Sequence, residues 1–171
     1  MPVGFLLDVF REHREDEAVA RLAGSVTFGG LLDRIEHVSE RLASAGIGGG
    51  NVVSLEADFS AGSIATLIAM IARGAIVVPI GPASLARRDA LLDLGQIESR
   101  VALDPEDAIA IEGTGHTASN ELYTRLRRAE HPGLVLFTSG SSGSPKGVVH
   151  DCTRLLEKYR TRRHRLRTLL F

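Results

Sequence analysis

The positions of apolar residues predict helices and strands that alternate along the chain. In the segment 28–45 the apolar residues recur four, three and four positions apart, at Leu31, Ile35, Val38 and Leu42. This spacing places them on one face of a helix. Thr27 supplies a hydroxyl that can cap the start of this helix, and Gly46 is a residue type that commonly ends one.

Two short apolar runs predict buried strands on either side of a second helix. The segment 52–56 is rich in β-branched and apolar residues. The segment 75–80 is a continuous apolar run with Pro79 near its end, where a missing backbone donor costs least. Between them, the segment 60–74 has helical spacing and is apolar on most sides, so we expect a buried helix that stops at Gly74.

The remaining pattern continues this alternation and sets the expected fold class. It predicts short helices over 87–94, closed by Gly95, and over 120–129, and strands over 100–103, 108–111 and 133–137. Strands that alternate with helices imply right-handed crossovers. We therefore predict an α/β fold with a mostly parallel sheet and helices on both faces, in three αβα layers. Ligands bind beyond the carboxyl ends of the strands in such sheets, which draws attention to the residues after Phe137.

Composition limits the chain to one packed unit and excludes several classes of function. Its 171 residues, 44% hydrophobic and 24% charged, suffice for one core, and we expect 1–171 to form a single α/β subdomain. A formal net charge of -1 predicts no nucleic-acid partner. Arg73 breaks the longest apolar stretch and the N-terminus lacks a signal-peptide pattern, so we predict no membrane span and a cytoplasmic location. The single cysteine, Cys152, excludes an internal disulfide and predicts no zinc site.

A ten-residue loop follows the last predicted strand and contains only Gly, Ser, Thr, Pro and Lys. Its sequence over 138–147 is Thr-Ser-Gly-Ser-Ser-Gly-Ser-Pro-Lys-Gly, which has nothing to pack in a core. The glycines allow backbone N–H groups to approach an anion, and the hydroxyls add donors. Lys146, one of two lysines in the chain, adds a mobile positive charge. The loop therefore predicts a phosphate site rather than a flexible linker, and we expect it to join a strand to a helix-like segment.

Other nucleotide-binding motifs fit the sequence less well. The Gly-x4-Gly-Lys-Ser/Thr pattern fails because Pro145 precedes the lysine and Gly147 follows it. A dinucleotide fingerprint, Gly-x-Gly-x-x-Ala, begins at Gly113 and ends at Ala118, between a predicted strand and a predicted helix. The next strand is followed by Thr138, where the fingerprint needs an acidic residue for the ribose. An ordinary solvent loop explains this segment better.

Three segments of the chain match motifs of one enzyme family. Residues 25–31 are Ser-Val-Thr-Phe-Gly-Gly-Leu, which is similar to Leu-Thr-Tyr-x-Glu-Leu, and residues 71–80 are similar to Leu-Lys-Ala-Gly-x-x-x-Val-Pro. Residues 136–150 contain the specific match, to the phosphate loop Thr-Ser-Gly-Ser/Thr-Thr-Gly-x-Pro-Lys-Gly-Val. Ser142 stands where threonine is usual, and Gly30 replaces a glutamate that would complete a capping box. Together these segments resemble the ANL superfamily of adenylate-forming enzymes, which includes acyl-CoA synthetases, luciferases and nonribosomal peptide adenylation domains.

The resemblance implies a reaction in two halves. A carboxylate attacks the α-phosphorus of Mg-ATP to give an acyl-adenylate and pyrophosphate, and a thiol, often coenzyme A, then displaces AMP. The implied ligands are ATP, Mg²⁺ and coenzyme A, with a carboxylic acid as substrate. The residues implied to hold the β- and γ-phosphates are Thr138, Ser139, Gly140, Ser141, Ser142, Gly143 and Lys146. The resemblance covers only the beginning of the family's chain, so the small C-terminal domain is expected to be absent, and no residue here matches the catalytic lysine.

Three hypotheses about function follow. The first is the N-terminal part of an ATP-dependent acid–thiol ligase, of the acyl-CoA or aryl-CoA synthetase type. The second is a noncatalytic module that binds a phosphate ligand or a partner. The third is a dinucleotide-dependent oxidoreductase that uses the segment from Gly113 to Ala118. His150 follows the phosphate loop closely and is a further candidate for a ligand contact. The sequence does not identify the carboxylic acid, the thiol acceptor or the oligomeric state.

Overall fold

A six-stranded sheet forms the centre of the protein. The computed structural model describes residues 2–21, 24–139 and 145–161. Across the sheet the strand order is β6-β5-β3-β4-β7-β8. These strands are β3 (Val52–Glu56), β4 (Ile76–Ile80), β5 (Ser99–Leu103), β6 (Ile109–Gly113), β7 (Gly133–Ser139) and β8 (Pro145–Asp151).

The four central strands are parallel and the two edge strands are antiparallel. β3 pairs in parallel with β4 and β5, and β4 pairs in parallel with β7. At the edges, β6 runs antiparallel to β5, and β8 runs antiparallel to β7. The prediction of a mostly parallel sheet is confirmed, and the antiparallel edges are a feature that the pattern of apolar residues did not reveal.

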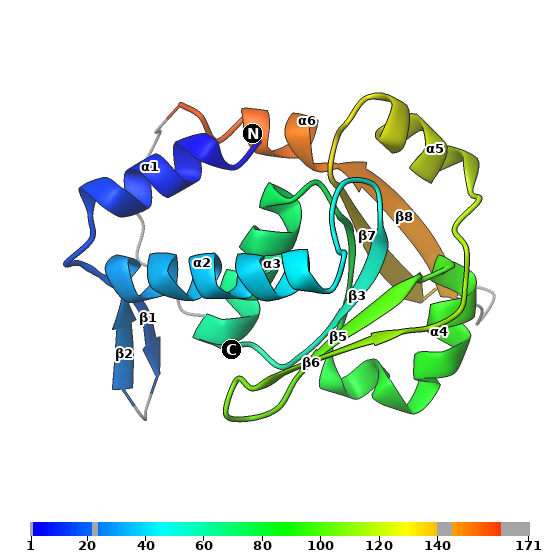
Figure 1. Cartoon of the computed structure of the whole chain (residues 1–171), viewed down its shortest axis with the longest axis horizontal. Helices are drawn as coiled ribbons and strands as arrows, with labels where there is room; N and C mark the ends of the chain where they lie inside the picture. Colours follow the sequence, from blue (N-terminus) through cyan, green and yellow to red (C-terminus); the bar gives the residue numbers. More distant parts are fainter. Residues whose placement is uncertain (1, 22–23, 140–144, 162–171) are drawn as a thin grey trace.

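Alternate residues of the central strands face two separate apolar cores. Val53 of β3 and Val77 of β4 belong to one core, whereas Val52 and Ile76 belong to the other. Helices α1 (Gly4–Glu12), α2 (Phe28–Ser44) and α3 (Ala61–Ala72) cover the first core, and α4 (Arg88–Gly95) and α5 (Glu121–Arg128) cover the second. Figure 1 shows these two groups of helices on opposite sides of the sheet. The three predicted αβα layers are therefore confirmed.

Helix α3 is buried, as its sequence predicts. Ser60 caps its first turn by accepting a hydrogen bond from the N–H of Ser63 at 2.9 Å, and the Ser63 hydroxyl accepts one from the N–H of Ser60 at the same distance. After the helix, Gly74 has a φ of 84°, a left-handed conformation that suits glycine and ends the helix as predicted. Within the described residues no helix, α3 included, has both the length and the apolar character needed to cross a membrane.

Several elements near the N-terminus and before α4 are not apparent from the sequence pattern. The antiparallel pair of β1 (Glu17–Arg21) and β2 (Gly24–Thr27) follows α1 and leads into α2. A 3₁₀ turn, η1 (Pro82–Arg87), precedes α4. Helix α4 itself ends with Gln96 in a left-handed conformation, with a φ of 50°, so the expected closure by Gly95 is displaced by one residue.

The segment after the phosphate loop is a strand, which corrects the expectation that a helix follows the loop. Val148 and Val149 are β-branched and suit the extended backbone of β8. Val149 packs against the second core. Helix α6 (Cys152–Glu157) begins directly after β8, and the Asp151 side chain caps its first turn. β7 and β8 thus form an antiparallel hairpin in which Ser139 and Pro145, the described residues on either side of 140–144, lie side by side.

Candidate functional site

The mouth of the β7–β8 hairpin brings a hydroxyl and a lysine together at the carboxyl end of β7. Thr138 lies directly opposite Lys146, and Ser139 lies opposite Pro145. The Thr138 hydroxyl donates to the backbone carbonyl of Lys146 at 3.4 Å. Lys146 is exposed and forms no ion pair with any residue that the structure describes. Its positive charge is therefore available to a ligand.

The predicted phosphate-binding residues divide into those that the structure places and those that it does not. Thr138 and Lys146 form the two sides of the hairpin mouth, and the backbone of Ser139 pairs across it. The remaining predicted residues, which lie outside the described ranges, are Gly140, Ser141, Ser142 and Gly143.

One face of the hairpin is anchored to the second core. Phe137 packs against that core, and Gly147 lies across from it on β8. A Cβ atom at position 147 would lie 3.4 Å from the Phe137 ring, which is an ordinary van der Waals contact, so the ring does not by itself require glycine there. On the opposite face, the paired residues Leu136 and Val148 are 41% and 43% exposed. The anchored face fixes where the loop leaves the sheet.

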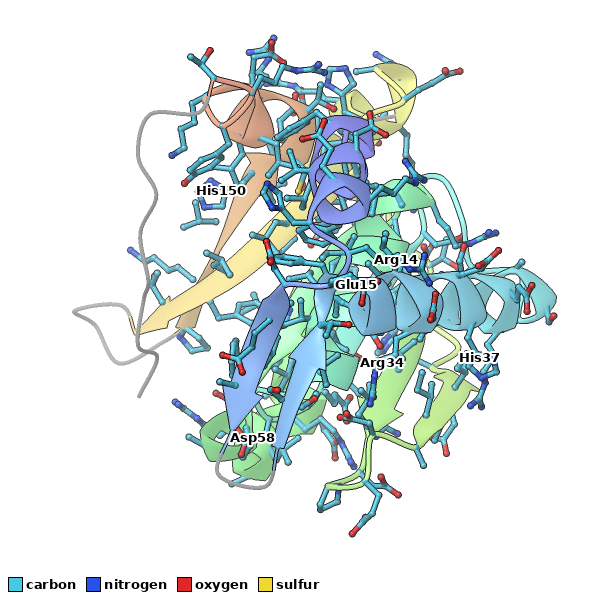
Figure 2. The ribbon with its side chains drawn as sticks, turned by 90° about the vertical axis from the view of Figure 1, so that its left-hand side faces the viewer. Arg14, Glu15, Arg34, His37, Asp58 and His150 are labelled. Atoms are coloured by element: carbon cyan, nitrogen blue, oxygen red, sulfur yellow. The ribbon has the colours of Figure 1, made fainter. Side chains whose placement is uncertain are left out.

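His150, which the sequence suggested as a candidate ligand contact, lies along β8 away from Lys146. It pairs with Leu134, four positions along β8 from Lys146. At a rise of about 3.3 Å per residue, this separation is about 13 Å along the strand. Figure 2 shows His150 toward the end of the molecule opposite to Asp58, which follows the carboxyl end of β3. His150 therefore lies away from Lys146 and from the described ends of the phosphate loop.

The dinucleotide fingerprint does not have the required geometry. Gly113 is the last residue of β6, which is an antiparallel edge strand rather than a central parallel strand. The N–H of Thr114 donates to the Glu98 carbonyl, and the N–H of Ala118 donates to the Glu98 carboxylate, both at 3.1 Å. The N–H of His116 donates to the Thr114 hydroxyl at 3.2 Å. Donors that a pyrophosphate would need are thus already used within the protein.

A buried ion pair that sequence reasoning missed lies at the carboxyl end of β3. The Glu56 side chain is only 4% exposed, and Arg100 donates from Nε and Nη2 to its two oxygens at 2.8 and 2.9 Å. The Ser54 hydroxyl donates to the same carboxylate at 3.2 Å. Burial by itself would raise the pKa of Glu56, but the hydrogen bonds and charge of Arg100 outweigh it and lower that pKa. The sequence signal that could have indicated this ion pair was a charged residue, Glu56, at the end of an apolar strand.

A second set of polar contacts joins three elements beside this ion pair. Asp107, in the turn between β5 and β6, accepts hydrogen bonds from the Ser60 hydroxyl at 2.5 Å and from the N–H of Gly62 at 3.1 Å. Position 62 needs glycine, because a Cβ atom there would overlap the Asp107 carboxylate. Arg34 of α2 pairs with the same carboxylate at 3.3 Å. The start of α3, the turn and α2 are thereby held together.

A cavity of about 310 Å³ opens between these groups at the carboxyl edge of the sheet. It lies at the carboxyl ends of β3, β4 and β5, and we call it the carboxyl-edge cavity. Its lining includes Glu56, Asp58, Phe59, Leu85 and Asp104. Sequence reasoning did not identify this cavity, because its walls come from three segments that are far apart in the chain.

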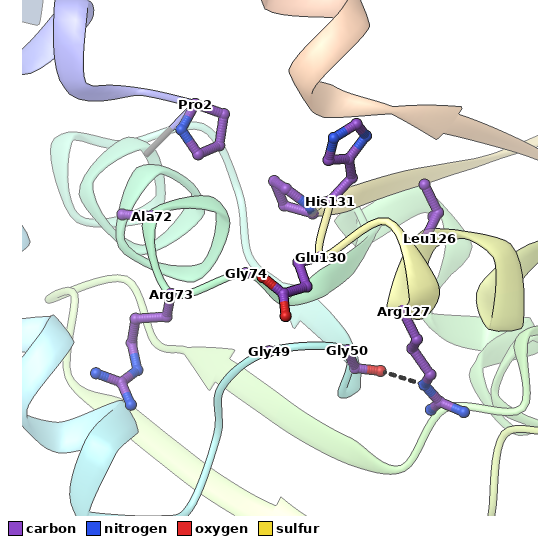
Figure 3. Close-up of a pocket in the computed structure, with 11 residues that line it drawn as sticks. Pro2, Gly49, Gly50, Ala72, Arg73, Gly74, Leu126, Arg127, Glu130 and His131 are labelled. Atoms are coloured by element: carbon purple, nitrogen blue, oxygen red, sulfur yellow. Dashed lines mark hydrogen bonds between the residues drawn. The ribbon is translucent and has the colours of Figure 1, made fainter.

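A second cavity, of about 510 Å³, lies at the opposite edge, where the strands begin. Figure 3 shows this amino-edge cavity between Gly50, Arg73, Arg127 and His131. Arg127 donates from Nε to the Gly50 carbonyl at 2.9 Å, and Arg73 donates from Nε to the Ile47 carbonyl at 2.8 Å. These arginines hold loops together. Because ligands of parallel sheets bind at the carboxyl ends of the strands, the phosphate loop remains the better candidate site.

The chain is similar to curated peptide synthetases over most of its own length. It is 30% identical over 139 residues to phenyloxazoline synthase MbtB of Mycobacterium sp. (strain MCS), which covers 77% of this chain and 12% of that protein. It is 31% identical over 148 residues to nonribosomal peptide synthetase atnA of Emericella nidulans, which covers 77% of this chain and 2% of that protein. The chain therefore spans only a small part of these relatives.

Solved structures share the fold of the chain. IdnL1 is 27% identical with a TM-score of 0.67, and the match covers 91% of this chain and 34% of IdnL1. The N-terminal subdomain of NpsA from Klebsiella oxytoca, in complex with 3-hydroxybenzoyl-AMSN, is 20% identical with a TM-score of 0.63, covering 86% of this chain and 41% of that one. At that identity the second likeness shows the fold alone.

A family model covers nearly the whole sequence and includes both strands of the hairpin. The model describes an AMP-binding enzyme and matches residues 7–169. The observed three-layer fold and the phosphate-loop sequence at the carboxyl end of β7 agree with it. The chain therefore belongs to the family of AMP-binding enzymes, within the ANL superfamily of adenylate-forming enzymes.

Proposed function

We propose that this chain supplies the part of an adenylate-forming enzyme that holds the β- and γ-phosphates of ATP while a carboxylic acid is activated. The observation that carries the proposal is the hairpin mouth, where Lys146, which forms no ion pair with a described residue, lies opposite Thr138 at the carboxyl end of β7. The proposed phosphate contacts are Thr138, Ser139, Gly140, Ser141, Ser142, Gly143 and Lys146. No residue of this chain is proposed to be catalytic.

The proposed chemistry is positioning and charge stabilisation. A carboxylate oxygen forms a bond to the α-phosphorus of ATP, and the bond from that phosphorus to the bridging oxygen breaks, so pyrophosphate leaves with the electron pair. Mg²⁺ bound to ATP would supply charge neutralisation on the phosphate oxygens. Lys146 and the N–H groups of the loop would stabilise the negative charge that develops on the leaving pyrophosphate.

The relatives bear on which thiol accepts the activated acid. The resemblance alone suggested coenzyme A. The two curated relatives named above are a phenyloxazoline synthase and a nonribosomal peptide synthetase, and neither is an acyl-CoA synthetase by name. We therefore place a carrier-protein thiol ahead of coenzyme A as the acceptor. Thioester formation with a pantetheinylated carrier, compared with coenzyme A in the same assay, distinguishes the two.

The direct test is pyrophosphate binding by the 171-residue chain, measured by isothermal titration calorimetry. Lys146→Ala should weaken binding about tenfold, because a charge-assisted contact to phosphate is lost. The chain provides a matched control in its only other lysine, Lys158, which is exposed at the end of α6. Lys158→Ala should bind as the wild type does. Equal losses in the two variants would mean that binding reflects general charge and not this loop.

Catalysis is tested by ATP–pyrophosphate exchange in the protein at its natural length, against aliphatic and aromatic carboxylic acids. Exchange that depends on one acid and is lost in Lys146→Ala supports carboxylate activation. Pyrophosphate binding without exchange for any acid would favour the alternative of a noncatalytic phosphate-binding module. The oxidoreductase alternative would require NADH binding in the absence of pyrophosphate binding.

A further inference from the structure

The carboxyl-edge cavity occupies the point where the chain reverses its direction across the sheet. From β3 the chain passes through α3 on one face to reach β4, and from β4 it passes through η1 and α4 on the other face to reach β5. Because β5 lies beside β3, the connections leave β3 and β4 in opposite directions. In doubly wound sheets, ligands bind in the crevice at the carboxyl ends of two such strands. The residues after β3 and β4 line the cavity here.

The walls of this cavity include apolar side chains that are partly exposed among the described residues. Phe59 is 48% exposed and Leu85 is 44% exposed, and both line the cavity. Pro82 and Leu103 add further apolar lining. The volume of about 310 Å³ lies at the small end of the range of about 300–1,000 Å³ for ligand pockets. These walls suit the apolar body of a small molecule.

The charges of the cavity all have one sign. Four of its lining residues are acidic and none is basic. Two of the four already have cationic partners: Glu56 pairs with Arg100, and Asp107 pairs with Arg34. The other two acidic residues, Asp58 and Asp104, form no ion pair with any residue in the described ranges.

Asp58 and Asp104 each retain a carboxylate oxygen for a ligand. Oδ1 of Asp58 accepts from the N–H of Phe59 at 2.7 Å. Oδ1 of Asp104 accepts from the N–H groups of Glu106 and Ala108 at 3.0 and 2.8 Å. The described residues donate no hydrogen bond to Oδ2 of either residue. Local backbone contacts therefore fix both carboxylates and leave one oxygen of each for a cation.

We propose that the carboxyl-edge cavity binds a small organic ammonium ion with an apolar body. The Phe59 ring follows Asp58 directly in the chain, and both line the same cavity. An aromatic face attracts a cation, and a carboxylate beside it supplies the opposite charge. The lining residues of this site include none of the described residues of the phosphate loop, and the site has the opposite charge preference. The proposal does not depend on the function proposed above.

The test is a titration of the ¹⁵N-labelled 171-residue chain with benzylammonium chloride, followed by amide chemical shifts. Benzyl alcohol has nearly the same shape without the charge and is the matched probe. We expect saturable shifts within 56–60, 82–85 and 103–107, with a dissociation constant of about 1 mM for benzylammonium. Binding of benzyl alcohol should be at least about tenfold weaker. Equal binding of the two compounds would overturn the proposal.

Variants locate the ammonium site. Asp58→Asn and Asp104→Asn keep an oxygen for the backbone N–H groups and should each weaken benzylammonium binding about fivefold. Glu36→Gln is the control, because Glu36 is an exposed residue of α2 that does not line the cavity. If both aspartate variants bind benzylammonium as Glu36→Gln does, the carboxylates are not the site and the proposal fails.

Two further measurements separate this proposal from other outcomes. Phe59→Leu keeps an apolar side chain but removes the ring, and it should also weaken benzylammonium binding; unchanged binding would contradict the role of the ring. Pyrophosphate binding by the same variants should match the wild type, because Lys146 and the hairpin are intact. A loss of ammonium binding with normal pyrophosphate binding is thus the result that supports a separate site.

Discussion

The two edges of the central sheet use their charged residues in different ways. At the amino edge, Arg127 donates to the carbonyls of Gly50 and Ala118 at 2.9 and 2.7 Å and pairs with Glu98 at 3.2 Å. These contacts join the loops that precede β3 and α5. The charge of Arg127 is therefore committed to structure, although it lines the larger of the two cavities described.

At the carboxyl edge, several charged groups form no ion pair with the residues that the structure describes. Lys146 at the hairpin mouth and Asp58 and Asp104 at the carboxyl-edge cavity form no ion pair within the described ranges. Cavity size by itself would have favoured the amino edge. We therefore rank the carboxyl edge ahead of the amino edge as a place for ligands, because a side chain that already holds a loop has fewer donors for a ligand.

The largest expected effect is on the amino-edge network. Arg127→Ala should lower the free energy of unfolding by about 2–3 kcal/mol, because two loop carbonyls lose their donor and Glu98 loses its partner. Arg125→Ala, which removes a 68% exposed arginine paired with Glu121, should cost no more than about 0.5 kcal/mol. Urea denaturation measures both. Similar losses in the two variants would show that the network does not hold the amino edge together.

The buried pair at the carboxyl edge should have an intermediate effect that depends on pH. Glu56→Gln should cost about 1–2 kcal/mol at pH 7, because Arg100 loses its buried anionic partner. The folded-state pKa of Glu56 lies below its ordinary value of 4.5, so this stabilisation is present above pH 4.5 and is lost as pH falls through the folded-state pKa.

Acid titration of stability checks the sign of that effect. The wild type and Glu56→Gln should approach each other in unfolding free energy below pH 4.5, where the wild-type glutamate also becomes neutral. Glu112→Gln is the matched control, because Glu112 contacts the same Arg100 at 2.9 Å but is 64% exposed. It should change stability little at any pH. A constant difference between the wild type and Glu56→Gln across pH 3 to 7 would contradict the assignment.

A smaller effect is expected at Asp151, where β8 returns to the amino edge. Its carboxylate accepts from the N–H of Arg154 at 3.1 Å and bonds to Nδ1 of His131 at 2.8 Å. Burial by itself would raise the pKa of Asp151, but the bonds from His131 and Arg154 outweigh it and lower that pKa. Asp151→Ala should cost about 1 kcal/mol in urea denaturation, and Asp151→Asn, which keeps the cap, should cost less. Equal losses would assign the effect to His131 alone.

The smallest effect on stability is expected at the proposed phosphate site itself. Lys146→Ala should change the free energy of unfolding by less than about 0.5 kcal/mol, because the side chain is exposed and forms no ion pair among the described residues. The same variant should lose most of its pyrophosphate affinity. A large loss of stability in thermal unfolding would mean that Lys146 belongs with Arg127 among the structural charges, and the contrast between the two edges would fail.

Local sequence was enough to predict the layers of the fold and to single out the loop at 138–147 as a candidate phosphate site. The apolar stripe of α2, its cap at Thr27 and the strand 52–56 all follow from residue types and spacing within a few residues. The loop was recognisable because its chemistry comes from adjacent residues. The order of these elements along the chain then favoured a parallel sheet covered on both faces.

Contacts between distant residues could not be predicted in the same way. Glu56 and Arg100 are 44 positions apart, and they meet only because β3 and β5 are neighbours in the sheet. The strand β8 was missed because its valines form a run too short to separate a strand from a helix, until pairing with β7 selects the strand. The carboxyl-edge cavity depends on the position of β5 beside β3 in the sheet and on the reversal of chain direction between β3 and β4.

The sequence by itself therefore determined the αβα layers, the family resemblance and the position of the phosphate loop, because each depends on spacing or composition within a short segment. Only the tertiary structure decided which charges are committed to the protein and which are left for ligands. A side chain's partners are set by the neighbours that folding brings to it, so Arg127 becomes a structural group and Lys146 remains free among the described residues.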